Sequence, residues 1–332
     1  MKATINNQAY WLALTHLPEL GGATLRRLLE RFGRIENLFQ ATAIELAALP
    51  HLAPNIAQQL PKLSLNHASA ELEQLQQQGI GLLTWDDVDY PARLFDLASP
   101  PPVLFWRGQP SWSAGRMPAS SSTTKEVLPS CTSVAIVGSR QVSQRSRATA
   151  RRLASDLSER SVTIVSGLAL GIDQAAHQGT LDSPHGQTVA VLGNGLATIY
   201  PSQNRSLAKQ IIEQRRGVIL SEQRPELPAE PSHLMRRNRI IAALSQAVIV
   251  VEASRNSGAL EAARQAQKLG RRLYAYPGSL GTDWMLAQTE STPLAWDTPQ
   301  ADMVVAQIQQ PISQPVPIQP SLFDFVSDAG RG

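Results

Sequence analysis

The sequence predicts an α/β protein with a Rossmann-like parallel sheet, helices on both faces and a small all-helical domain in front of it. Six short runs rich in β-branched residues alternate with helical segments after residue 133, namely SVAIVG, VTIVSG, TVAVLG, GVILSE, AVIVVEA and RLYAYPG. This alternation indicates βαβ units with right-handed crossovers, and so a parallel sheet covered on both faces. Before residue 80, apolar residues recur instead at helical spacing, which predicts short helices.

These patterns divide the chain into five segments. They are a helical domain (1–80), a connector with an expected edge strand at Val103 to Trp106 (81–108), a disordered insertion (109–132), a Rossmann-like domain (133–298) and a disordered tail (299–332). The insertion is rich in Ser, Thr and Pro, and the tail in Gln and Pro. Neither composition supplies enough periodic apolar residues for a packed core.

The helical domain is expected to be of the SAM or helix-hairpin-helix kind. LPELGGATLRRLL and LPHLAPNIAQQL share a Leu-Pro pair, a short turn and a new helix. In helix-hairpin-helix modules, backbone N–H groups at the second helix start can bind a DNA phosphate. Arg26 and Arg27 follow the first turn, but nothing basic follows the second. DNA contact and simple packing turns both remain open here.

Composition excludes several classes of protein. The single cysteine, Cys131, rules out an internal disulfide framework and a cysteine-based zinc site, which fits a reducing, cytoplasmic location. No stretch approaches the ~18 apolar residues of a membrane span, so we expect no membrane partner.

The positive charge is concentrated in the centre of the chain. The whole chain has a formal net charge of +3, but Val134 to Arg272 holds nineteen basic and ten acidic residues, a net charge of +9. Almost all of these cations are arginines, which suit bidentate contacts with phosphate. Solvated helix faces explain part of this charge.

Glycine-rich turns follow the predicted strands. They contain Gly138, Ser139 and Arg140; Ser166 and Gly167; Gly193-Asn194-Gly195; Ser257 and Gly258; and Pro277, Gly278 and Ser279. Ligands of open parallel sheets bind at the carboxyl ends of the strands. Glycine lets backbone N–H groups approach an anion, and the following helix contributes its positive end. The repetition predicts a phosphate site.

Further cations and one aromatic residue extend this prediction. Arg236, Arg237, Asn238 and Arg239 precede an apolar run and resemble a helix start, where cations oppose the helix dipole unless an anion binds. The alternative is pairing with Glu222 or Glu252, and partial pairing is expected. Tyr200 could stack on a base.

No catalytic constellation is apparent. His177, His185 and His233 are widely separated in the sequence, and no metal cluster or cofactor motif stands out. An Asp173–His177 pair is possible on one helix face, although a structural hydrogen bond is the commoner explanation. We therefore expect a protein that is not an enzyme and has no cofactor.

An ordered set of motifs resembles the DNA-processing protein A (DprA/Smf) family over about residues 10–290. The motifs are VAIVGSR, VSGLALGIDQAAH, VAVLGNGL, IYP with Asn204, LSE, RRNRIIAALSQAVIVVEA, SGAL and YPGS. The resemblance implies binding of single-stranded DNA, a homodimer formed through the Rossmann domain, and loading of the RecA recombinase during natural transformation. It also implies that Gly138, Ser139, Arg140, Ser166, Gly167, Arg237, Asn238 and Arg239 line the DNA pocket. Leu170, Ala262 and a short loop after Ser279 depart from the family pattern.

Two further interpretations stay open. In the tail, Gln319, Leu322 and Phe323 resemble the short peptide with which bacterial DNA-handling proteins bind the sliding clamp. Pro277-Gly278 and Gly281-Thr282 faintly resemble the PGG-GT turn of phosphoribohydrolases, which predicts a nucleotide-processing enzyme as the alternative. The acid expected after that turn is missing, because Met285, Leu286 and Ala287 follow it.

Overall fold

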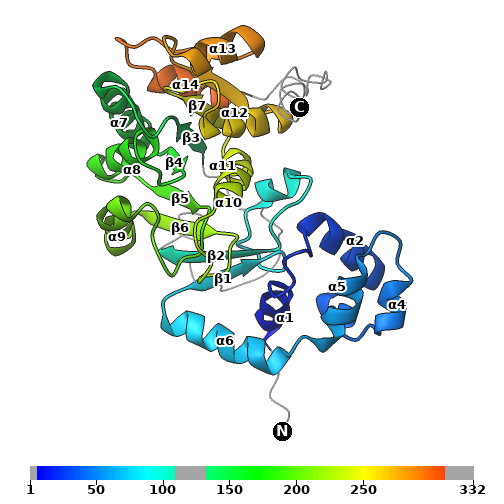
Figure 1. Cartoon of the computed structure of the whole chain (residues 1–332). Coiled ribbons are helices and arrows are strands. Elements are labelled where there is room, and N and C mark those ends of the chain that lie inside the picture. The colour runs from blue at the N-terminus through cyan, green and yellow to red at the C-terminus, as the bar shows by residue number, and fades with distance from the viewer. Residues whose placement is uncertain (1–5, 109–131, 311–332) are drawn as a thin grey trace, which may run out of the picture.

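A nine-stranded sheet forms the centre of the computed structural model, which describes residues 6–108 and 132–310 (Figure 1). The strand order is β1-β2-β6-β5-β4-β3-β7-β8-β9. The strands are β1 Gly81–Thr84, β2 Val103–Gly108, β3 Ser133–Val137, β4 Thr163–Ser166, β5 Thr188–Leu192, β6 Gly217–Ser221, β7 Ala247–Val250, β8 Arg272–Ala275 and β9 Thr292–Pro293. Strands β3 to β9 pair in parallel, whereas β1 and β2 are antiparallel to their neighbours. The predicted Rossmann-like fold is confirmed.

Helices cover both faces of the sheet (Figure 1). On one face lie α7 Gln144–Glu159, α8 Ile172–Asp182, α9 Arg205–Glu213 and α14 Ala301–Ile308. On the other lie α11 Asn238–Leu244, α12 Gly258–Lys268 and α13 Leu280–Gln288, with α10 Pro231–Arg236 leading into α11. Strand residues alternate between the two cores: Val134 and Ile136 contribute to the first, and Ala135 and Val137 to the second. Both faces are therefore apolar, as a covered parallel sheet requires.

The connector belongs to the sheet rather than linking two separate units. The strand expected at the edge, β2, pairs with β6 on one side and with β1 on the other, so β1 forms the edge. The four residues of β1 were not predicted as a strand, because so short an apolar run carries little period-two signal.

The first residues of the expected disordered tail are helical, so that part of the prediction is wrong. Helix α14 buries Ala301, Val304 and Ile308 against the core of α7. Arg160, which follows α7, pairs with Asp302 at 2.5 Å, and the Tyr274 hydroxyl donates to Gln307. The helical spacing of these apolar residues was not recognised, because the segment is short and is flanked by glutamines. The insertion at 109–131 and the clamp-like residues Gln319, Leu322 and Phe323 lie outside the described residues.

The N-terminal helices pack directly on the sheet. They are α1 Asn7–Leu14, α2 Gly22–Phe32, α3 Ile35–Leu38, α4 Ala43–Ala47, α5 Pro54–Gln59 and α6 Leu65–Gln77. One continuous apolar core joins Trp11 and Leu12 of α1 to Leu82, Phe105 and Ile219 of the sheet. Among the described residues, no helix is long and apolar enough to span a bilayer.

A buried histidine lies between α8 and the sheet. His177 Nδ1 is 2.7 Å from Thr188 Oγ1, and that hydroxyl already donates to the Ile164 carbonyl, so the imidazole is the donor. His177 Nε2 has no hydrogen-bond partner among the described residues. Burial, assisted by the charge of Arg237, lowers the pKa of His177 to about 3. The structural interpretation of His177 is therefore confirmed, and no Asp173–His177 pair forms.

This neutral histidine makes folding sensitive to acid. Between pH 6.5 and 3 the unfolded chain binds a proton on His177 and the folded chain does not, so the free energy of unfolding should fall as pH drops. The slope from one such group is about 1.4 kcal/mol per pH unit. Urea unfolding at several pH values should show a shallower slope for His177→Gln than for the wild type. His185→Gln, which replaces an exposed histidine, should keep the wild-type slope. Equal slopes for all three proteins would contradict the prediction.

Candidate nucleic-acid interface

The strand order reverses next to β3. From β3 the chain proceeds through β4, β5 and β6 in one direction, and then returns to place β7 and β8 on the other side of β3. In open α/β sheets, ligands bind in the crevice outside the carboxyl ends of the strands at such a switch point. Here the crevice is flanked by the turn at 138–140 after β3 and the loop at 252–258 after β7.

The turn after β3 is fixed against the loop after β7. The Ser139 N–H donates to the Glu252 carbonyl at 2.8 Å, and the Glu252 carboxylate accepts from the Ser143 N–H and hydroxyl at 3.1 and 3.0 Å. A Cβ on Gly138 would lie 2.4 Å from Ile172 and 2.9 Å from the Glu252 carbonyl. Gly138 is therefore needed for close packing, and the Ser139 N–H is already used.

Arg140 extends from this turn into solvent. It is exposed, and its side chain makes no hydrogen bond or ion pair with any residue of the described ranges. It is the sequence-predicted site residue whose charge is most available for a phosphate.

Arg255 is a second exposed arginine whose charge is available for a phosphate, and it was not among the residues predicted for the site. It lies in the exposed segment Ser254-Arg255-Asn256 after β7, and it too has no side-chain partner within 6–108 and 132–310. The loops that carry Arg140 and Arg255 flank the switch point because β3 and β7 are neighbours. The two arginines are far apart in the sequence, so only the strand order could have predicted that their loops are neighbours.

Arg237 is buried beneath the turns instead of lining a surface. Only 6% of Arg237 is exposed, and its Nη1 donates to the Gly167 carbonyl at 2.6 Å and to the Val191 carbonyl. Its Nε donates to Asn238 Oδ1 at 2.9 Å, and Nη2 lies 3.8 Å from Asp173 Oδ2. Burial lowers the pKa of Arg237, while Asp173 opposes this change. These contacts make Arg237 a support for the ends of β4 and β5.

Asp173 occupies the N–H groups of the turn after β4. Its Oδ2 accepts from the Gly167 and Ala169 N–H groups at 3.1 and 3.4 Å, and burial raises the pKa of this carboxyl. The Ser166 hydroxyl donates to the Ile136 carbonyl at 2.6 Å. The donors expected to bind a phosphate at Ser166 and Gly167 are thus engaged within the protein.

Asn238 and Arg239 are also largely engaged. The Asn238 amide donates to the Gly258 carbonyl at 2.9 Å. Arg239 forms a close ion pair with Glu222, and the exposed Arg236 lies 3.7 Å from the same carboxylate. Burial lowers the pKa of Arg239. The expected pairing with Glu222 is confirmed, and two arginines on one carboxylate leave a positive charge near Arg236.

The predicted helix start at 236–239 is wrong in detail. Helix α10 ends at Arg236 and α11 begins at Asn238, with Arg237 between them. Arg236 consequently lies in the last turn of a helix, where the dipole favours a cation.

Two of the glycine turns remain open at the surface. A Cβ on Gly258 would have Met235 Sδ as its nearest neighbour at 3.4 Å, and a Cβ on Gly278 would meet no atom within 4 Å. Gly278 has a φ of +108°, which glycine adopts readily. Ser257 and Ser279 cap α12 and α13, and the Ser279 hydroxyl also accepts from the Ala253 N–H at 3.1 Å.

The remaining predicted features lie around these turns. Tyr200 is 43% exposed, and Asn204 anchors its segment by donating to the Leu168 carbonyl at 2.8 Å. By contrast, a Cβ on Gly193 would meet Leu234 at 2.8 Å and one on Gly195 the Arg224 carbonyl at 2.0 Å. Those two glycines serve packing.

The first hairpin-like turn of the helical domain is covered. A Cβ on Gly22 would lie 1.9 Å from the Pro100 carbonyl oxygen, and the Ala23 N–H faces the Ser99 hydroxyl at 3.4 Å. Arg26 donates to the Phe95 carbonyl. These contacts favour the packing interpretation of this turn.

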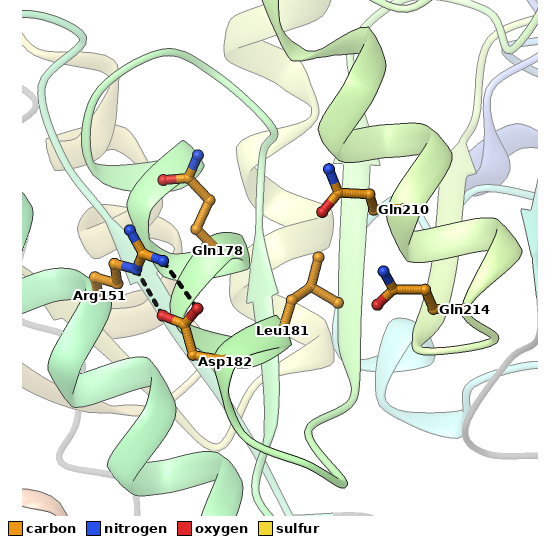
Figure 2. A pocket seen from close by; sticks show the side chains of 6 residues that line it. All are labelled: Arg151, Gln178, Leu181, Asp182, Gln210 and Gln214. Atoms are coloured by element: carbon orange, nitrogen blue, oxygen red, sulfur yellow. Dashed lines mark hydrogen bonds and ion pairs between the residues drawn. The ribbon is translucent and has the colours of Figure 1, made fainter.

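A polar hollow on the helical face is separate from the strand ends. It measures about 230 Å³ and is lined by Arg151, Gln178, Leu181, Asp182, Gln210 and Gln214 (Figure 2). Its cation is neutralised, because Arg151 Nε and Nη2 bond to Asp182 at 2.6 and 2.8 Å. None of the sequence-predicted site residues lines it.

Comparison with known proteins assigns the chain to a family. Residues 81–292 match the model of DNA recombination-mediator protein A. Protein Smf of Synechocystis is 38% identical over 278 residues, which are 82% of this chain and 65% of that protein. Protein Smf of Escherichia coli is 32% identical over 84% of this chain and 70% of its own length. The match therefore spans less than two thirds of the Synechocystis protein.

Two solved structures resemble the fold. DNA processing protein A from Streptococcus pneumoniae superposes with a TM-score of 0.69 at 28% identity, covering 92% of this chain and 99% of that one. DNA processing protein A from Helicobacter pylori, described as having a unique single-stranded DNA binding mode, gives 0.56 at 27% identity over 68% of this chain and 96% of its own. The family model, the relatives and the fold together show that the chain belongs to the DNA recombination-mediator protein A (DprA/Smf) family.

Proposed function

We propose that this protein binds single-stranded DNA at the carboxyl ends of its parallel strands. The observation that carries the proposal is the pair of exposed arginines, Arg140 and Arg255, on the two loops that flank the switch point; neither has a side-chain partner among residues 6–108 and 132–310. The description of the Helicobacter pylori relative as a single-stranded DNA binder supports the choice of ligand.

The distribution of free cations favours a phosphate backbone as the ligand. Most cations of the basic centre are used in internal ion pairs or bonds to carbonyl groups. Within this basic centre, the cations with no side-chain partner among the described residues are Arg140, Arg147, Arg205, Arg215, Arg255 and Lys268. Of these, Arg140 and Arg255 follow strand ends, where they can neutralise phosphates without reading base edges. Binding should consequently depend on salt and only weakly on sequence.

The other predicted site residues divide into two groups in this proposal. Ser257, Gly258, Pro277, Gly278 and Ser279 form the open rim, and Tyr200 offers a face for base stacking. Gly138, Ser139, Ser166, Gly167, Arg237, Asn238 and Arg239 hold the strand ends in place beneath it. A bound strand would contact the first group and Arg140, Arg236 and Arg255.

We further propose the biological role that the family resemblance implies. The protein would protect incoming single-stranded DNA and load the RecA recombinase during natural transformation, in the cytoplasm, as a homodimer and without catalysis. Docking on the sliding clamp through Gln319, Leu322 and Phe323 remains a separate proposal. The nucleotide-processing alternative loses support, because Thr282 is buried in the cap of α13 and Gly281 packs on the Ala253 carbonyl.

Replacing Arg140 or Arg255 with alanine should weaken single-strand binding. Each change removes one phosphate contact, so affinity should fall similarly for all sequences and the slope of log K against log salt should decrease by about one. Gel shifts with several oligonucleotides at several salt concentrations measure both effects. Arg215 also has no side-chain partner among the described residues, but it lies between α9 and the amino end of β6, away from the carboxyl ends of the strands. Arg215→Ala should therefore leave binding unchanged. Wild-type affinity in both Arg140→Ala and Arg255→Ala would contradict the assigned interface.

Replacing Arg237 with alanine should act on stability. It leaves the Asp173 carboxylate buried without its cation, a change that costs about 3 to 5 kcal/mol in other proteins. Urea unfolding measures this loss, and Arg236→Ala, which changes a half-exposed neighbour, should cost less than about 1 kcal/mol. An Arg237→Ala protein with wild-type stability but no DNA binding would instead show that Arg237 contacts DNA.

A further inference from the structure

The helical domain carries a cluster of metal-ligating side chains that lies apart from the DNA interface. It consists of His16, His67 and Glu71, whose ligand atoms all lie within 4.8 Å of one another. No other such group of three or more occurs among residues 6–108 and 132–310. His16 and His67 are exposed and Glu71 is half-buried, so an ion can reach the cluster from solvent.

Helix packing brings the three groups together. His67 and Glu71 are four residues apart in α6 and therefore lie on one helix face. His16 follows the end of α1, and α1 packs closely on α6 through the small residues Ala9, Ala13 and Ala68. The imidazole rings of His16 and His67 are 5.8 Å apart between centroids. The backbone thus presents two donors from α6 and one from the residues that follow α1.

The donors match the chemistry of zinc. Two imidazoles and one carboxylate are a common protein ligand set for Zn²⁺, with a water in the fourth position. Magnesium and calcium need six or more oxygen ligands, which this cluster lacks.

Arg224, which follows β6, occupies part of this cluster. Its Nη2 donates to Glu71 Oε1 at 2.7 Å, and its Nη1 lies 3.1 Å from Thr15 Oγ1 and 3.0 Å from His16 Nε2. His16 Nε2 also lies 2.9 Å from Glu71 Oε2. His16 Nε2 can carry either a hydrogen that it donates to Glu71 or a lone pair that accepts from Arg224. A metal needs that lone pair, so it cannot bind Nε2 while Arg224 uses it.

We propose that His16, His67 and Glu71 form a zinc site in which Zn²⁺ and the Arg224 guanidinium compete for His16. Arg224 connects the Rossmann-like domain to the helical domain through these contacts. Zinc would therefore weaken one link between the two domains, and by thermodynamic reciprocity the link weakens zinc binding. The proposal does not depend on DNA binding.

Zinc titration of the untagged full chain tests the site. We expect one Zn²⁺ per chain by isothermal titration calorimetry, with affinity reduced more than about tenfold in His67→Ala. His67 does not contact Arg224, and its exposed side chain can be removed without opening a core. His185→Ala, at an exposed histidine outside the cluster, should bind zinc as the wild type does. No zinc binding by the wild type, or equal binding by His67→Ala, would overturn the site.

A second variant tests the competition. Arg224→Gln removes the cation beside His16 and should tighten zinc binding several-fold, whereas magnesium chloride should give no binding in any of these proteins. Weaker zinc binding in Arg224→Gln would overturn the competition, and magnesium binding that depends on His67 would overturn the assignment to zinc. Circular dichroism spectra matched to the wild type identify the variants that are correctly folded.

Discussion

The buried Arg237 guanidinium is the interaction on which the strand ends depend. A cation with 6% exposure is tolerated only when hydrogen bonds and an opposite charge replace its water shell. Arg237 obtains these from the Gly167 and Val191 carbonyls, from Asn238 and from Asp173. Asp173 in turn holds the Gly167 and Ala169 N–H groups, and Asn238 holds the Gly258 carbonyl. One side chain thereby joins the ends of β4 and β5 to the start of α12.

This arrangement changes how the protein can bind an anion. In many phosphate sites, free backbone N–H groups at a glycine turn provide the donors. Here the Ser139 N–H donates to the Glu252 carbonyl. The Gly167 and Gly278 N–H groups donate to the carboxylates of Asp173 and Asp283, respectively. These three N–H groups are not free for an anion, so exposed side chains such as Arg140 and Arg255 would supply much of the attraction in the proposed interface. Such contacts tolerate variable backbone geometry and suit a flexible polyanion.

The parallel sheet could be predicted from sequence because buried strands with β-branched residues and intervening helices carry strong local signals. Pairing of the cations at 236–239 with Glu222 or Glu252 was also expected, and Arg239 pairs with Glu222. Strand β1 and helix α14 were missed, because each is too short for its periodicity to exceed the composition around it. The burial of Arg237 and the position of Arg255 depend on which strands become neighbours. The strand order follows from packing between residues far apart in the sequence, which a local sequence pattern does not reveal.

Because one core joins the N-terminal helices to the sheet, the unit that packs together differs from the segment that the family model matches. The match to the family model begins at residue 81. Leu82, Phe105 and Ile219 nevertheless pack against Trp11, Leu12 and other residues that precede this point. The segment that matches the family model is thus smaller than the unit whose apolar core is continuous. An exchange of N-terminal modules between relatives would have to carry a matching surface of β1, β2 and α9 with it. Substitutions in these helices are consequently limited by the sheet surface on which the helices pack.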